Sequence, residues 1–313
     1  MYLGLYTECL GSFSLDEMLD HASRLGLNAL EIATGNWSRP AHIDLNLLLE
    51  SAEARSVLLA KIEGRGLRIE ALNCSGNHLE PNLRGKEQEK VVYKTFELAE
   101  LLGVEKIVMM SGLPGGGREG KYPVWVTNTW PPVFTEILEY QWNEVAIPWW
   151  KEAVHRAECH GIRYIALENH PNTLVHNHKT IRRLRESVGK MIGINLDPSH
   201  TFYMGGDPLQ MAKQMAKEDL VYHIHAKDTR IETEQAALDT LIELAADSEP
   251  PTDRSWNYVA VGAGHDRLWW SQFLAGLKLN GYDGVISLEV GDRSMDELEG
   301  VERSARFLKE ILL

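Results

Sequence analysis

The feature that most constrains the fold is an alternation of short apolar runs with longer amphipathic segments along the whole chain. The runs are nearly continuous in apolar residues, which is typical of parallel strands that are covered on both faces. Eight of them are predicted to be strands, at residues 2–7, 28–34, 67–74, 104–110, 163–169, 191–197, 220–228 and 284–290. Helices are expected between them, notably at residues 14–26, about 53–66, 87–103, 207–218, 268–280 and 296–312.

The ends of the expected helices support this division. Ser14 and Glu17 have the spacing of a capping box at the start of the first helix. Several helices are expected to end at a glycine, which suits the left-handed residue that terminates a helix: Gly26, Gly66, Gly103, Gly161 and Gly281. Eight strand–helix units predict an α/β fold, a (β/α)8 TIM barrel, with a doubly wound open sheet as the alternative. No G-x-G-x-x-G follows the first strand, which weakens a dinucleotide-binding version of the open sheet.

Two segments interrupt the alternation, at about residues 112–132 and 229–266. We expect them to be long loops after strands, which lie at the active-site face of such a barrel, although surface insertions or oligomer contacts would fit equally well. With 313 residues and no recognisable linker, the chain is predicted to be one barrel domain over residues 1–313.

Composition narrows the classes of partner and location. The formal net charge of −13 argues against a nucleic-acid partner, since phosphate backbones are bound by clustered Lys and Arg. The three cysteines have no C-x-x-C spacing, and no run approaches the roughly 20 apolar residues of a membrane span. We therefore expect a cytoplasmic protein with no membrane partner, and the sequence leaves open whether it forms a homo-oligomer.

Polar residues concentrate at the ends of the last four predicted strands. Glu168 lies in ALENHP, Asp197 in NLDPSH, His225 in HIHAKD and Glu289 in SLEVGD. An ionised carboxylate at the end of an apolar strand is costly unless it is paired or binds a metal. In a closed barrel these ends would converge, giving three carboxylates and one imidazole. That set suits Mn²⁺, Mg²⁺, Co²⁺ or Zn²⁺, and we take Mn²⁺ as the first expectation for a single bound divalent ion.

These four motifs, in this order, resemble the xylose-isomerase-like TIM-barrel superfamily of sugar isomerases and epimerases. The resemblance implies that Glu168, Asp197, His225 and Glu289 bind the metal. Asp197-x-x-His200 is most similar to the ketose 3-epimerases, which implies proton transfer next to a carbonyl through an enediolate. Glu168 and Glu289 would then be the catalytic base and acid. The chain departs from those epimerases at Leu174, where they have a glutamate, and at Ile231, where they have an arginine.

Further residues are expected to contact a small carbohydrate substrate. They are His200, His78, His223, Lys227 and Arg230. His223 is alternatively a second metal ligand, since it points to the same side of its strand as His225. Glu31 is a weaker pocket candidate, and Lys227 and Asp228 are alternatively an ion pair.

Three functions remain open at this point. The first is an isomerase or epimerase of a sugar, keto-sugar or cyclitol. The second is a lyase or dehydratase, including cleavage of a 3-keto-glycoside, with the same site. The third is a non-catalytic sugar-binding barrel or a subunit of a hetero-complex. The superfamily that the chain resembles also contains the endonuclease IV group, whose three-metal DNA-cleaving site needs several more histidines. The resemblance does not extend to that site, because the fourth strand ends in Met109 and Met110 rather than in a histidine.

Overall fold

Eight parallel strands form a closed barrel with helices between them. The computed structural model describes residues 1–242 and 249–313. Around the barrel the strand order is β1-β10-β7-β6-β5-β4-β3-β2. The strands are β1 (Tyr2–Tyr6), β2 (Ala29–Ala33), β3 (Arg68–Asn73), β4 (Lys106–Met109), β5 (Tyr164–Glu168), β6 (Ile192–Leu196), β7 (Val221–Ala226) and β10 (Val285–Leu288). Each lies within one of the eight predicted runs, so the predicted fold class is confirmed.

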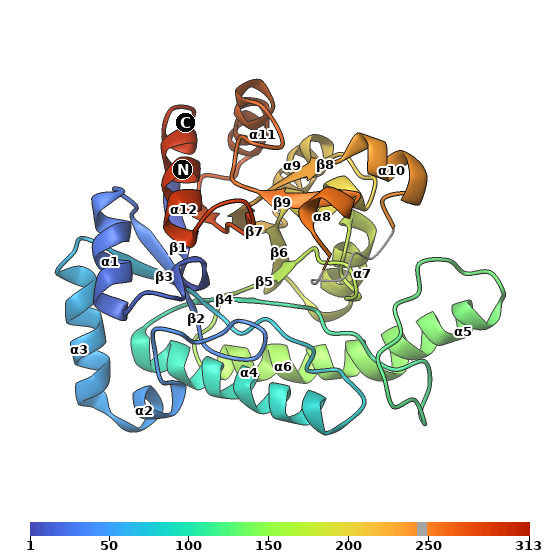
Figure 1. The fold of residues 1–313 in the computed structure, drawn as a ribbon. Helices are drawn as coiled ribbons and strands as arrows, with labels where there is room; N and C mark the ends of the chain where they lie inside the picture. The colour runs from blue at the N-terminus through green and yellow to red at the C-terminus, as the bar shows by residue number, and fades with distance from the viewer. Residues whose placement is uncertain (243–248) are drawn as a thin grey trace. The chain divides into compact units, whose positions relative to one another are not determined.

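The helices that follow the strands are labelled in Figure 1. They are α1 (Leu15–Arg24), α2 (Leu45–Glu50), α3 (Ala52–Glu63), α4 (Leu83–Leu102), α5 (Val133–Glu139), α6 (Ile147–Cys159), α7 (His178–Val188), α8 (Pro198–Tyr203), α9 (Pro208–Lys217), α10 (Thr233–Asp239), α11 (Arg267–Leu279) and α12 (Glu297–Lys309). Three short segments are 3-10 or π helices: η1 (Thr7–Leu10), η2 (Tyr140–Ala146) and η3 (Pro251–Asp253).

The predicted helix ends are confirmed. The Ser14 side chain accepts the backbone N–H of Glu17, and the Glu17 carboxylate accepts the backbone N–H of Ser14. All five glycines expected to end helices have positive φ, between 58° and 108°. At Gly103, for example, φ is 69° directly after α4, a conformation that a side chain would strain.

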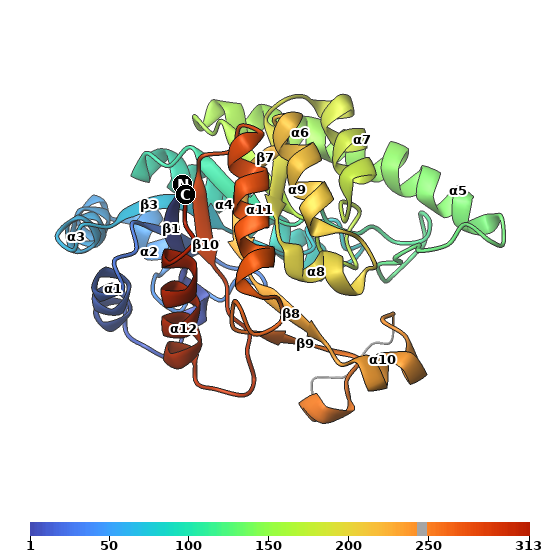
Figure 2. The same ribbon diagram turned by 90° about the horizontal axis from the view of Figure 1, so that it is seen from above.

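Backbone contacts divide the chain into two compact units. The first contains Met1–Glu31, Lys61–Arg68 and Asn195–Leu313, and the second contains Ile32–Ala60 and Ile69–Ile194. In the first unit β1 pairs in parallel with β10 and with β2, and β10 pairs with β7. The chain ends lie together there, with the Met1 amino group 3.3 Å from the Leu313 carbonyl oxygen. Figures 1 and 2 show N and C next to each other.

The second unit contains the parallel set β3–β4–β5 and the first of the two predicted insertions. After the glycine-rich loop, α5, η2 and α6 follow one another without a break and form one long helical run (Figure 1). Trp142 and Trp150 of this helical run are buried in the second unit. Nε1 of Trp150 donates a hydrogen bond to the Ser111 carbonyl oxygen at 3.1 Å.

The second insertion contains structure that the sequence analysis did not predict. Strands β8 (Asp228–Ile231) and β9 (Trp256–Val259) pair antiparallel, and β8 leads from the end of β7 to α10 (Figure 2). Residues 243–248 of the predicted insertion lie outside the described residues. Among the described helices, none has the length and apolar content that crossing a membrane requires.

Candidate metal centre

Three of the four predicted metal ligands lie together in the first unit. Asp197 follows β6, His225 belongs to β7 and Glu289 follows β10. One ligand atom from each lies within 4.8 Å of the others, and Nδ1 of His225 is 2.6 Å from Oε2 of Glu289. Asp197 and His225 are buried, and Asp197 accepts the backbone N–H of Ser199 at 2.7 Å. Two carboxylates and one imidazole at the carboxyl ends of these strands are a suitable donor set for a divalent cation.

Glu168 is the last residue of β5 and belongs to the second unit. Its side chain is buried, as expected for an acid that ends an apolar strand. Its role as the fourth metal ligand stays a prediction.

Glu31 lies behind His225 and controls which of its ring nitrogens can bind a metal. The carboxylate oxygens of Glu31 are 3.0 and 3.1 Å from Nε2 of His225. If Nε2 carries the proton and donates it to Glu31, the lone pair of Nδ1 faces Glu289. A carboxylate behind a ligating histidine is a common feature of metal sites, because it fixes the ring and raises its basicity. From the sequence, Glu31 was expected only as a weaker pocket residue.

The same carboxylate binds two further groups. Nε2 of His223 is 2.8 Å from Glu31, and the Ser287 hydroxyl donates to it at 2.9 Å. Burial by itself raises the pKa of Glu31, but the His225 and His223 imidazoles outweigh it and hold that pKa below its ordinary value. Glu31, His223 and His225 also have ligand atoms within 4.8 Å of one another. Since both oxygens of Glu31 face imidazole nitrogens, we interpret this group as support for His225. His223, expected at the substrate, is fully buried beside Glu31.

Lys227 pairs with Glu289, and the alternative pairing with Asp228 is wrong. Nζ of Lys227 is 2.5 Å from Oε1 of Glu289 and 4.4 Å from the centre of the Tyr258 ring. Asp228 instead accepts N–H groups from Gly262 and His265. Glu289 is therefore shared: Oε1 faces the ammonium group, and Oε2 faces the histidine that would bind the metal.

His200 lies between Asp197 and two tyrosines, and its side chain is fully buried. Its Nε2 is 3.2 Å from Oδ2 of Asp197, and its Nδ1 is 2.6 Å from the hydroxyl of Tyr203 and 3.1 Å from that of Tyr258. Tyr203 follows His200 by three positions in α8, a spacing that could have indicated the contact. Tyr258 is 58 residues away and carried no such signal.

Arg230 lies on the exposed part of β8. Its guanidinium is 2.7 Å from Glu232 and its side chain is 50% exposed. This placement gives Arg230 a surface ion pair, and its expected substrate contact stays a prediction.

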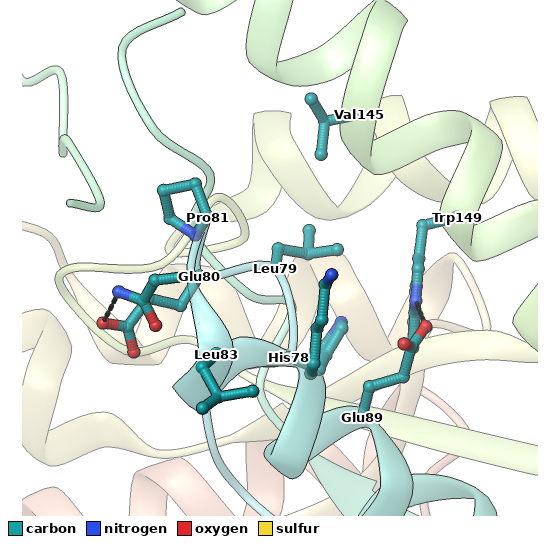
Figure 3. Close-up of a pocket in the computed structure, with 10 residues that line it drawn as sticks. His78, Leu79, Glu80, Pro81, Leu83, Glu89, Val145 and Trp149 are labelled. Carbon is teal, nitrogen blue, oxygen red and sulfur yellow. Dashed lines mark hydrogen bonds between the residues drawn. The ribbon is translucent and has the colours of Figure 1, made fainter. Parts of the chain in front are cut away.

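His78 lines a separate cavity within the second unit (Figure 3). The cavity has a volume of about 420 Å³ and lies between the start of α4 and the helical run, with Leu79, Val145 and Trp149 among its lining residues. The His78 ring stacks on Trp149 at 3.9 Å between centroids, and its Nε2 has no hydrogen-bond partner. Burial lowers the pKa of His78 to about 3, so the ring is neutral at physiological pH.

Comparison with known proteins identifies relatives of the whole chain. A family model described as "Xylose isomerase-like TIM barrel" matches residues 19–311. The chain is 45% identical over 314 residues to "Uncharacterized protein YfiH" of Bacillus subtilis (strain 168), with 100% of this chain and 99% of the relative covered.

Solved structures share the fold at low sequence identity. The probable 3-DHS dehydratase AsbF of Bacillus anthracis has a TM-score of 0.69 at 18% identity, covering 99% of each chain. An IOLI protein with a bound zinc atom has a TM-score of 0.68 at 19% identity, covering 100% of this chain and 98% of that one. A structure of L-ribulose 3-epimerase has a TM-score of 0.63 at 13% identity, covering 99% and 94%.

Proposed function

Because this chain belongs to the xylose isomerase-like TIM-barrel family, we propose that it is a divalent-metal-dependent isomerase or epimerase of a sugar, keto-sugar or cyclitol. The observation that carries the proposal is the arrangement around His225. Nε2 of His225 lies 3.0 Å from Glu31, and Nδ1 lies 2.6 Å from Glu289. A ligand atom of Asp197 lies within 4.8 Å of ligand atoms of His225 and Glu289. The ring is buried and held in one orientation, as a metal ligand requires.

The proposed ligands are Asp197, His225 and Glu289, with Glu168 as the predicted fourth ligand. A divalent ion bound there would act as a Lewis acid toward adjacent substrate oxygens and stabilise negative charge that develops on them. Mn²⁺ is the first ion to test, and the zinc-containing relative makes Zn²⁺ the second.

The two glutamates are the proposed acid and base. Glu168 would remove a proton from the carbon next to the carbonyl, and Glu289 would return one on the opposite face. Return of a proton on the face opposite to its removal would invert the carbon.

A second candidate is a lyase or dehydratase at the same site. It is favoured by the Lys227–Glu289 pair, in which an ammonium proton lies beside a carboxylate and could be delivered to a leaving hydroxyl group. The structural relative described as a probable 3-DHS dehydratase is a reason to test this candidate. Both candidates begin with removal of the same kind of proton.

The test combines metal content with solvent-deuterium exchange. Purified protein would be stripped with a chelator, reloaded with Mn²⁺ or Zn²⁺ and incubated in D₂O with a panel of ketoses, inososes and 3-keto-glycosides. We expect metal-loaded protein, and not stripped protein, to introduce deuterium at one position of one substrate. An epimerase would leave the product mass unchanged apart from the label. A lyase would give a product that has lost water or the aglycone. Asp197→Asn should lose both metal and exchange. Full exchange by stripped protein, or stoichiometric metal in Asp197→Asn, would contradict the proposal.

A further inference from the structure

We propose that Tyr258, on strand β9 of the β8–β9 hairpin, is a specificity-determining residue whose hydroxyl oxygen accepts a hydrogen bond from an uncharged hydroxyl group of the substrate. The inference rests on the proposed function, since it assigns a substrate contact at the same site. It concerns a part of the chain that is added to the barrel, because β8 and β9 pair only with each other.

The position of Tyr258 relative to the candidate metal centre is the first argument. Its hydroxyl is 3.1 Å from Nδ1 of His200, and the same imidazole is 3.2 Å from the proposed ligand Asp197. Its ring lies under the ammonium group of Lys227, which itself pairs with the proposed ligand Glu289. Tyr258 is thus one residue removed from two of the proposed ligands, and its side chain is only partly buried.

The protons and lone pairs around His200 determine what the hydroxyl of Tyr258 can still bind. If Nε2 of His200 carries the ring proton, Nδ1 has one lone pair, which can accept a single hydrogen. The hydroxyl of Tyr203, at 2.6 Å, is the closer donor to it. The hydroxyl of Tyr258 can then donate to the oxygen of Tyr203, at 3.1 Å. The proton of the Tyr258 hydroxyl is then donated within the protein. The lone pairs of its oxygen can still accept a hydrogen bond from a ligand.

The hairpin holds Tyr258 in one place. Trp256, two residues earlier on β9, stacks on Tyr203 with ring centres 3.8 Å apart and an interplanar angle of 5°. Asp228, at the base of the hairpin, accepts the backbone N–H groups of Gly262 and His265. A side chain fixed by packing and hydrogen bonds loses little entropy when it binds a ligand, which favours selectivity.

The chemistry of the surroundings indicates the ligand class. Burial raises the pKa of Tyr258 to about 12, so the residue offers a neutral hydroxyl at physiological pH. The nearby cation Lys227 is paired with Glu289, and Arg230 is paired with Glu232. Neighbouring carboxylates and a neutral acceptor suit a hydroxyl donor and disfavour a phosphate or carboxylate group at this position.

The test is Tyr258→Phe, which removes one oxygen and keeps the ring, with Tyr282→Phe as a matched control. The hydroxyl of Tyr282 donates to the Val285 carbonyl within its own segment, away from the proposed ligands. For the substrate found by deuterium exchange, we expect Tyr258→Phe to raise KM about tenfold with kcat within about twofold, and Tyr282→Phe to change neither. Metal content should equal that of the wild type in both variants. One mono-deoxy substrate analogue should be bound equally by the wild type and Tyr258→Phe.

Failure of the inference and failure of the proposed function give different results. An unchanged KM in Tyr258→Phe, or loss of metal from that variant, would overturn the role of Tyr258. The proposed function would still stand if the wild type catalyses deuterium exchange. If no sugar of the panel is turned over, calorimetry would measure the binding of the same sugars to metal-loaded protein and so test the Tyr258 contact without the reaction. Weaker binding of a sugar by Tyr258→Phe would then support the contact without the reaction. Absence of binding by any sugar would overturn both.

Discussion

Nε2 of His225 lies 3.0 Å from Oε2 of Glu31, while Nδ1 of the same ring lies 2.6 Å from Oε2 of Glu289. The two nitrogens of the His225 imidazole therefore face two carboxylates that differ in burial and in hydrogen-bond partners. Glu31 is buried and also binds His223 and Ser287, so it has a fixed position. Glu289 is partly exposed and pairs with Lys227, at the end of the barrel where a ligand would enter. We expect the two carboxylates to respond differently to mutation.

Glu31→Gln is expected to weaken metal binding without removing a ligand. The amide keeps the shape of the side chain but loses the charge that orients His225 and raises its basicity, which typically lowers metal affinity by about 10- to 100-fold. Competition with a chelator would measure the dissociation constant. Glu70→Gln is a matched control, because Glu70 also pairs with a neighbour at 2.7 Å but with Lys106, on β4. Equal affinity of Glu31→Gln and the wild type would contradict the assigned role.

Glu168→Gln and Glu289→Gln are each expected to abolish turnover, by a factor of at least about 10² in kcat, because each removes a proposed acid or base. His200→Ala should mainly raise KM, because His200 holds the hydroxyl of Tyr203, which in turn holds that of Tyr258, the proposed substrate contact. Steady-state kinetics on the substrate found by exchange would measure both parameters. Near wild-type kcat in either glutamine variant would remove that residue from the acid–base pair.

Asp228→Ala is expected to destabilise the fold by about 3 kcal/mol or more. The buried carboxylate accepts backbone N–H groups of Thr229, Gly262, Gly264 and His265 and the indole N–H of Trp270, and these donors would lose their partner. Urea unfolding followed by circular dichroism would give the free energy of unfolding.

Asp20→Ala is the control for this change, because Asp20 forms an exposed pair with Arg65 that should contribute no more than about 1 kcal/mol. Similar losses of stability in the two variants would show that the Asp228 hydrogen bonds are not a special anchor of the hairpin.

His78→Phe is expected to be more resistant to acid than the wild type. The folded pKa of His78, about 3, lies below the ordinary value of 6.5, so the unfolded chain binds an extra proton between these pH values. This group therefore lowers the stability of the wild type as pH falls from 6.5 toward 3, by up to about 1.4 kcal/mol per pH unit. Phe can retain the stacking on Trp149 and has no proton to bind.

The free energy of unfolding of wild type and His78→Phe would be compared from pH 7 down to pH 4. The advantage of the variant should grow steadily over that range. The exposed His155→Phe should show no such trend. A constant difference between His78→Phe and the wild type would mean that His78 is not held neutral by burial.

The barrel itself could be predicted from local patterns in the sequence. A strand such as Ile192–Leu196 is fully buried, and it was recognisable because a run covered on both faces has to be apolar along its whole length. Asp197, immediately after it, was conspicuous for the same reason, as a charge where the apolar run ends. Gly103 was assigned to a helix end because a left-handed residue there strains any other side chain. These signals involve neighbours along the chain.

The β8–β9 hairpin could not be predicted in the same way. Its strands are four residues each, and they are short and partly exposed, so the apolar signal is weak. The pairing of Arg230 with Asn257 joins residues that lie on opposite sides of α10 and η3 in the chain.

What the sequence determined by itself is the order of eight buried strands and the placement of acids and histidines at their carboxyl ends. Only the tertiary structure decided which atoms meet. Glu31 and His225 are 194 residues apart, Tyr258 and His200 are 58 apart, and Lys227 pairs with Glu289, 62 positions away, rather than with its neighbour Asp228. The physical reason is that burial and helix termination are encoded by neighbouring residues, whereas the pairing of two side chains depends on strand register and on the path of an added hairpin. Those are fixed only when the chain closes on itself.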